Sequence, residues 1–122
     1  MKLTLDSRNQ HRIRSYAPGE VRVNERVLHS NCLIAPDQIV ADWTGRSADS
    51  LSFADLQSIF ALHPELVLLG TGAQQQFPPA VIQAAFQERG IGFEVMNLGA
   101  ACRTFNILLS EDRRVVAALL LE

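Results

Sequence analysis

The stretch Leu66-Val67-Leu68-Leu69-Gly70-Thr71-Gly72 joins four consecutive apolar residues to two closely spaced glycines. An apolar run this short, with no polar alternation, is typical of a strand that is covered on both faces. The glycines end the strand, because glycine adopts turn conformations that other residues avoid. We therefore predict an interior strand of a sheet that carries helices on its faces.

Helix signals lie on both sides of this strand. Ser52, followed three residues later by Asp55, predicts a capped helix start, and Pro64 ends that helix. A second helix is predicted from Pro78-Pro79 to Gly90. Its inward face is predicted to consist of Val81, Ile82, Ala85 and Phe86.

The last third of the chain continues the alternation. Residues 92–96 and 114–121 have the pattern of strands, and the apolar run of the second indicates an interior position. Residues 99–110 predict a helix that is apolar almost all round and therefore mostly buried. Its only polar stripe is Arg103, Asn106 and Ser110. This order predicts an α/β sheet with parallel neighbouring strands.

The N-terminal part has a different pattern. Residues 1–19 show no clear period apart from a turn at Ala17-Pro18-Gly19, so we predict an extended or partly mobile N-terminal segment, followed by one α/β domain over residues 20–122. Residues 20–23 and 27–34 predict a β-hairpin that turns at Asn24-Glu25, and residues 39–43 predict another strand.

Composition and charge exclude several classes of protein. The 122 residues are 48% hydrophobic and 20% charged, with a net charge of −2, which indicates a globular domain and argues against a nucleic-acid binder. The apolar run from Val115 to Leu121 is far shorter than the roughly 20 residues of a membrane-spanning helix. Residues 1–6 lack a signal-peptide core, so we expect a cytoplasmic protein.

One local excess of charge remains. Residues 1–26 carry six Lys or Arg against three Asp or Glu. A local anionic partner for this segment is one interpretation, and a solvated terminus is the one we favour.

A candidate binding site follows from the predicted topology. The loops at residues 70–77 and 97–103 leave parallel strands and are expected at the same edge of the sheet, where α/β proteins bind ligands. The second loop leads into a helix N-terminus, which together with Arg103 could hold an anionic small molecule. The candidate ligand-binding residues are Gly70, Thr71, Gly72, Asn97, Gly99 and Arg103. The alternative is that the glycines only permit a tight turn.

Cys102 is the one candidate for covalent chemistry. It lies in the first turn of a predicted helix beside Arg103, and both features would lower the pKa of its thiol. The alternative, which we favour, is a small buried core residue. His29 and Cys32 have metal-ligand spacing, but too few further ligands are available, so we predict no metal and no cofactor.

Several segments resemble the Mth-type (DUF498-like) family of small α/β domains. They are residues 69–72, 90–96, 100–108 and 111–115, and the run from Glu94 to Val115 is the most specific. The resemblance implies a three-layer α/β fold with a central mixed β-sheet and an N-terminal β-hairpin. Asn97-Leu98 stands where many relatives have Asp-Thr, which weakens any proposal of acid–base catalysis there.

Two functional hypotheses remain. The family includes a mitochondrial complex I assembly factor, so the resemblance favours a non-enzymatic interaction module with a protein partner, assisting assembly of a respiratory or other membrane or redox complex. The alternative is a small-molecule or anion-binding protein or enzyme that uses the loops after Gly70 and Asn97. This alternative fails if Arg103 is buried and paired with Asp42 or Glu111.

Overall fold

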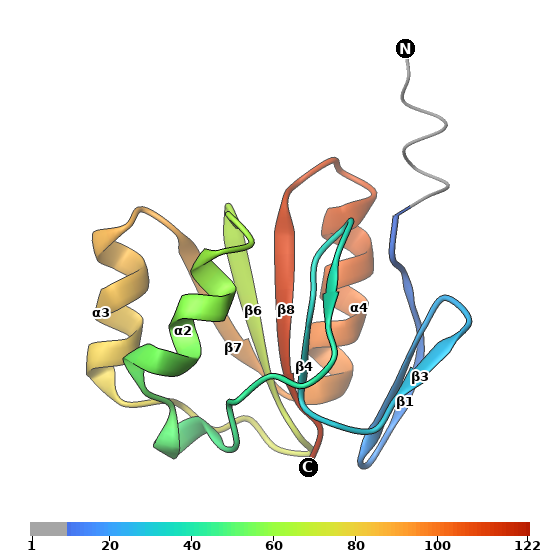
Figure 1. Ribbon diagram of the computed structural model, residues 1–122, viewed down its shortest axis with the longest axis horizontal. Helices are drawn as coiled ribbons and strands as arrows, with labels where there is room; N and C mark the ends of the chain where they lie inside the picture. The colour runs from blue at the N-terminus through green and yellow to red at the C-terminus, as the bar shows by residue number, and fades with distance from the viewer. Residues whose placement is uncertain (1–9) are drawn as a thin grey trace.

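A five-stranded mixed sheet forms the centre of the structure, a computed structural model that describes residues 10–122 (Figure 1). β8 pairs parallel with β6 and antiparallel with β4, and β6 pairs parallel with β7. The strands, in spatial order, are β5 (Ile39–Val40), β4 (Cys32–Ile34), β8 (Val115–Leu120), β6 (Leu66–Thr71) and β7 (Gly92–Met96). The predicted α/β fold with a mixed central sheet is confirmed.

β8 and β6 form the buried middle of this sheet. Every residue of β8 is buried, as is β6 from Val67 to Thr71. Two separate clusters of buried apolar residues lie on the opposite faces of the sheet, one containing Leu68 and the other containing Leu69. Successive side chains of a strand point to opposite faces of the sheet. The uninterrupted apolar sequences of β6 and β8 therefore supply apolar side chains to both buried faces.

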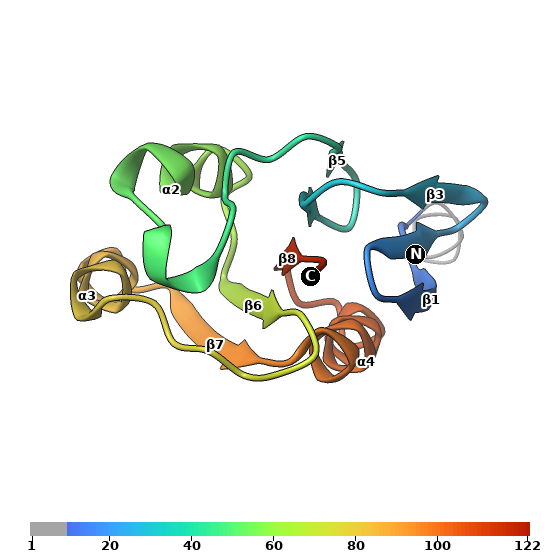
Figure 2. The same cartoon turned by 90° about the horizontal axis from the view of Figure 1, so that it is seen from below.

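The helices lie on both faces. α2 (Phe53–Phe60) and α3 (Ala80–Glu88) cover one face, and α4 (Leu98–Leu109) covers the other (Figure 2). A short 3₁₀ turn, η1 (Ala48–Ser50), precedes α2. The predicted capping box is present: the backbone N–H of Ser52 donates to the Asp55 carboxylate at 2.9 Å.

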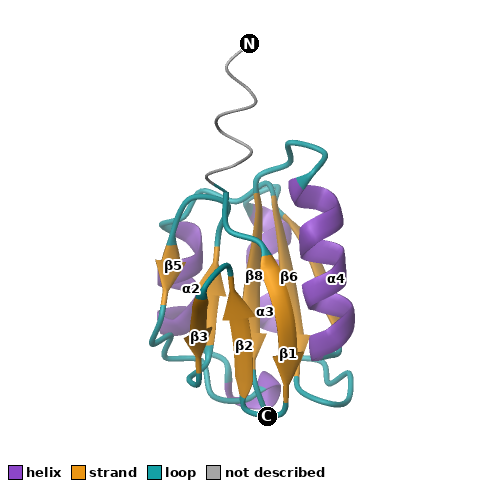
Figure 3. Ribbon diagram, turned by 90° about the vertical axis from the view of Figure 1, so that its right-hand side faces the viewer, coloured by secondary structure: helices purple, strands orange, loops and turns teal. Residues whose placement is uncertain are grey.

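A second, antiparallel sheet lies beside α4. It consists of β1 (Ile13–Ala17), β2 (Glu20–Val23) and β3 (Arg26–Leu28), with β2 in the middle (Figure 3). Its inward residues belong to the same buried cluster as the inward face of α4. These residues are Ile13, Val21, Val23 and Leu28. The small sheet and α4 thus cover one face of the central sheet together.

The N-terminal strands differ from the prediction in three places. Regular structure begins at Ile13 rather than at residue 20, and the register of β1 shifts between Ile13 and Ser15; residues 1–9 lie outside the described part. The strand predicted over residues 27–34 is two strands, β3 and β4, in different sheets. The strand predicted over residues 39–43 ends at Val40.

Two predictions of burial on the helices are wrong. Val81 on α3 is 57% exposed. The other three residues of the predicted inward face, Ile82, Ala85 and Phe86, are buried. Ile107 on α4 is 58% exposed, although the whole circumference of this helix was expected to be mostly buried. α4 packs against the central sheet and against β1, but Ile107 remains exposed, so apolar composition alone overstated the burial of this helix.

The polar stripe of α4 faces β1. The Asn106 side-chain amide donates to the Ile13 carbonyl at 2.8 Å and accepts from the Ile13 N–H at 3.0 Å, as a neighbouring strand would. One turn earlier, Arg103 donates to the Tyr16 hydroxyl at 2.8 Å. A Cβ on Gly99 would lie 2.6 Å from that hydroxyl oxygen, so Gly99 leaves the space for the Tyr16 ring. We name this set of contacts the α4–β1 seam.

We expect Asn106→Ala to lower the free energy of unfolding by about 2 kcal/mol, because it leaves a backbone donor and acceptor of Ile13 without partners. Urea unfolding at neutral pH measures the change. The control is Ser110→Ala on the same helix, whose exposed hydroxyl bonds only to the adjacent Ile107 carbonyl. Equal effects of the two substitutions would contradict this role of Asn106.

Candidate functional site

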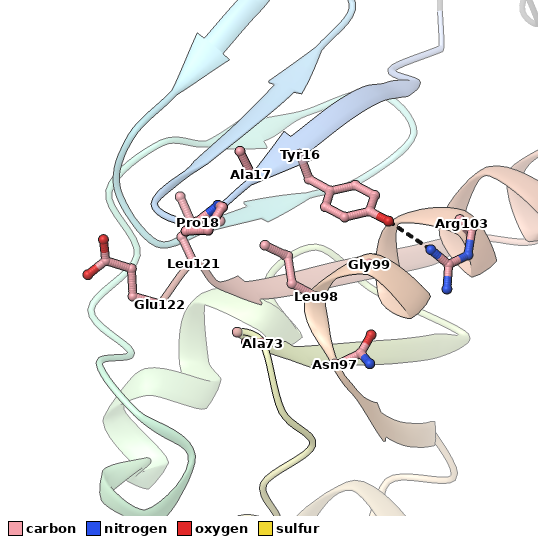
Figure 4. Close-up of a pocket in the computed structure, with 11 residues that line it drawn as sticks. Tyr16, Ala17, Pro18, Ala73, Asn97, Leu98, Gly99, Arg103, Leu121 and Glu122 are labelled. Carbon is pink, nitrogen blue, oxygen red and sulfur yellow. Dashed lines mark hydrogen bonds between the residues drawn. The ribbon is translucent and has the colours of Figure 1, made fainter.

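An open pocket of ≈ 740 Å³ lies at the carboxyl ends of β6, β7 and β8 (Figure 4). Four segments that are distant in sequence form its walls. The lining residues are Tyr16, Ala17 and Pro18 of the small sheet, Gly72 and Ala73 after β6, Asn97, Leu98, Gly99 and Arg103 at the start of α4, and Leu121 and Glu122 after β8. Most of this lining is apolar.

The two predicted loops meet at this edge. The Leu98 N–H donates to the Gly72 carbonyl at 2.7 Å, which ties the start of α4 to the end of β6. Four of the six candidate ligand-binding residues line the pocket, namely Gly72, Asn97, Gly99 and Arg103. Their position is therefore compatible with ligand binding, which stays a prediction.

The other two candidates, Gly70 and Thr71, are not among the lining residues, and both have structural contacts of their own. A Cβ on Gly70 would lie 2.9 Å from the Ala101 Cβ, so this glycine allows α4 to approach β6 closely. The Thr71 hydroxyl donates to the Gln74 carbonyl at 2.7 Å and accepts from the Gln76 N–H at 2.9 Å. Thr71 therefore holds the loop that leads to α3.

Arg103 is the cationic side chain of the pocket. It is exposed, and within residues 10–122 it forms no ion pair with Asp42, Glu111 or any other carboxylate. Its hydrogen bond to Tyr16 uses one of the five N–H donors of a guanidinium. The burial and pairing that would have excluded a binding role for Arg103 are absent from the described structure.

Asn97 has a structural function at the same edge. Its side chain accepts from the Ala100 N–H at 2.8 Å and so caps α4. A capping asparagine satisfies one of the backbone donors that a helix start leaves open. The side-chain oxygen of Asn97 is therefore already engaged in capping α4.

Sequence reasoning missed the wall formed by Tyr16, Ala17 and Pro18. The turn at residues 17–19 was recognisable, but no local pattern placed it against α4 or against the end of β8. Here the Gly19 N–H donates to the Leu121 carbonyl at 3.1 Å. This bond, between residues about a hundred positions apart, helps to hold the turn at the pocket.

Cys102 does not have the chemistry that its position suggested. It is buried, and desolvation raises the pKa of its thiol to about 12, outweighing the opposite effect of Arg103. This shift is opposite to the lowering that a reactive thiol would show, and the burial agrees with the favoured interpretation of Cys102 as a small core residue. Burial likewise raises the pKa of the Cys32 thiol to about 12.

Within residues 10–122, no group of three or more His, Cys, Asp or Glu side chains is arranged to hold a metal ion. No helix in the same range is long and apolar enough to cross a membrane.

The buried thiols predict a loss of stability at alkaline pH. Above the ordinary thiol pKa of 9.0 the unfolded chain loses a proton that the native Cys102 keeps up to about 12. Because the native state then binds more protons, the free energy of unfolding falls as pH rises through this window. We expect wild type to lose about 1.4 kcal/mol per pH unit more than Cys102→Ala, measured by guanidinium unfolding.

Cys32→Ala provides the matched comparison, because its thiol has the same direction and size of shift. Like Cys102→Ala, this variant should lose less free energy of unfolding per pH unit than wild type does. If the free energy of unfolding fell equally with pH in wild type and in both variants, burial would not be keeping these thiols protonated in the native state.

Comparison with known proteins adds an independent finding. Residues 13–120 match the model of a family described as "Protein of unknown function (DUF498/DUF598)". The chain is 34% identical over 110 residues to the zebrafish (Danio rerio) NADH dehydrogenase (ubiquinone) 1 alpha subcomplex assembly factor 3. The match covers 88% of this chain, which spans 63% of the length of that relative.

Solved structures of bacterial proteins share the fold. A Xanthomonas campestris protein has a TM-score of 0.83 and 40% identity, with 91% of this chain and 84% of that chain covered. A Bordetella pertussis protein described as a Mth938-like domain has a TM-score of 0.78 and 28% identity, with 91% and 85% covered.

Proposed function

The chain belongs to the DUF498/DUF598 family, as its resemblance to Mth-type domains indicated, and from this premise we propose that it is a protein-binding module that assists the assembly of a respiratory membrane complex. The name of the zebrafish relative, an assembly factor of NADH dehydrogenase, supports that role. The observation that carries the proposal is a set of apolar side chains exposed at one end of the molecule.

This set consists of Phe53, Phe77 and Val81, which we name the apolar edge. They are 56%, 63% and 57% exposed, and they lie where α2 and α3 begin. Both helices run back along the sheet, so their first turns lie at the carboxyl end of β6, the same end as the pocket (Figure 1). Exposed apolar side chains that form one continuous surface are typical of protein-binding sites, and our proposal takes these three to form such a surface.

More than half of each of these side chains remains in contact with water in the folded protein. Burying them against a partner would remove apolar surface from water, which is the main favourable term in protein association. The aromatic rings of Phe53 and Phe77 would supply the large apolar contacts that dominate binding energy in interfaces. The apolar edge therefore fits a partner that presents its own apolar surface.

We expect the double substitution Phe77→Ser and Val81→Ser to reduce capture of NADH dehydrogenase subunits from native extract by about tenfold, which corresponds to about 1.4 kcal/mol of binding free energy. The tagged chain serves as bait and mass spectrometry measures the subunits. The variant should also fail to restore assembled complex, seen on native gels, in a strain that lacks the chain.

The matched control is Ile107→Ser, which removes an equally exposed apolar side chain from α4. It should capture and complement as wild type does. All three side chains are exposed, so urea unfolding should show nearly unchanged stability for each variant. Full capture and complementation by the double variant would refute the proposal.

A further inference from the structure

The pocket at the carboxyl edge has the dimensions and lining of a small-molecule site. Its volume of ≈ 740 Å³ lies within the roughly 300–1,000 Å³ that is usual for such sites. Leu98, Leu121 and Pro18 contribute apolar walls, and the Tyr16 ring closes one side (Figure 4). A ligand that fills this space needs an apolar body.

Charge distinguishes the two ends of the pocket. Figure 4 shows Arg103 at one end and Glu122 at the other, with the apolar side chains between them. Arg103 bonds to the neutral Tyr16 hydroxyl and, within residues 10–122, forms no ion pair with a carboxylate. The pocket thus offers a cation whose charge no described group neutralises.

We propose that this pocket binds a small monocarboxylate with an apolar tail, its carboxylate on Arg103 and its tail along Leu98 and Leu121. The planar guanidinium matches a carboxylate through two parallel N–H donors. The one positive charge of Arg103 balances the one negative charge of a monocarboxylate. Arg103 lies at one end of the pocket and Glu122 at the other, so an acidic group bound on Arg103 sets the direction of the ligand.

This site goes beyond the proposed protein-binding role and does not depend on it. The apolar edge lies on α2 and α3, whereas the pocket is formed by α4, the turn at residues 17–19 and the ends of β6 and β8. Loss of ligand binding would therefore leave the interaction proposal standing, and the reverse is equally true.

Three eight-carbon probes test the proposal: octanoate, octanol and octylamine, each added below its micelle concentration to ¹⁵N-labelled protein at neutral pH. We expect octanoate to shift the backbone amide signals of Ala73, Gly99 and Leu121. It should bind at least tenfold more tightly than octanol, which lacks the charge, and octylamine should bind more weakly than octanoate because Arg103 repels it.

Two variants separate ligand binding from the structural contact of Arg103. Arg103→Gln should reduce octanoate affinity to that of octanol while octanol affinity stays the same. Tyr16→Phe removes the same hydrogen bond from the α4–β1 seam but keeps the guanidinium, so it should retain octanoate binding.

Three results would overturn the proposal. The first is an octanoate titration without localised shifts at the pocket. The second is equal affinity of wild type for octanoate and octanol. The third is a Tyr16→Phe variant that loses as much octanoate affinity as Arg103→Gln, because Arg103 would then act only by holding the seam.

Discussion

The paired hydrogen bonds between the Asn106 side chain and the backbone of Ile13 set the position of the small sheet. No strand pair joins the two sheets within residues 10–122, so apolar contacts, the α4–β1 seam and isolated hydrogen bonds, such as that from the Gly19 N–H to the Leu121 carbonyl, hold them together. Apolar contacts have little directional preference, whereas two hydrogen bonds to one residue specify a register. The pocket depends on that register, because Tyr16, Ala17 and Pro18 form one of its walls.

The interior of the fold leaves no polar group available for binding. Among the described residues, the buried polar or charged side chains are Asp55 and Thr71, and both are used in hydrogen bonds that hold α2 and the loop before α3. No buried side-chain nitrogen or oxygen in that range lacks a partner. Within the described residues, the polar side chains that remain available for binding therefore lie on the surface.

Local signals in the sequence were reliable for features that depend on the residues of a single helix or strand. The capping box of Ser52 and Asp55, the run of β6 and the polar stripe of α4 are all present where the residues indicated them. These signals failed for features that depend on contact with another part of the chain. The strand predicted over residues 27–34 divides because β4 pairs with β8, in a different sheet from β3.

The sequence by itself determined the α/β class, the helices and inner strands, and the meeting of the loops after β6 and β7 at one edge. These features follow from periodicity and strand direction, which are local properties. Only the tertiary structure decided that β1 lies against α4, that Val81 is exposed and that an apolar pocket surrounds Arg103. The reason is physical: the contact between Asn106 and Ile13 joins residues 93 positions apart, and no local preference of the chain encodes such a pairing.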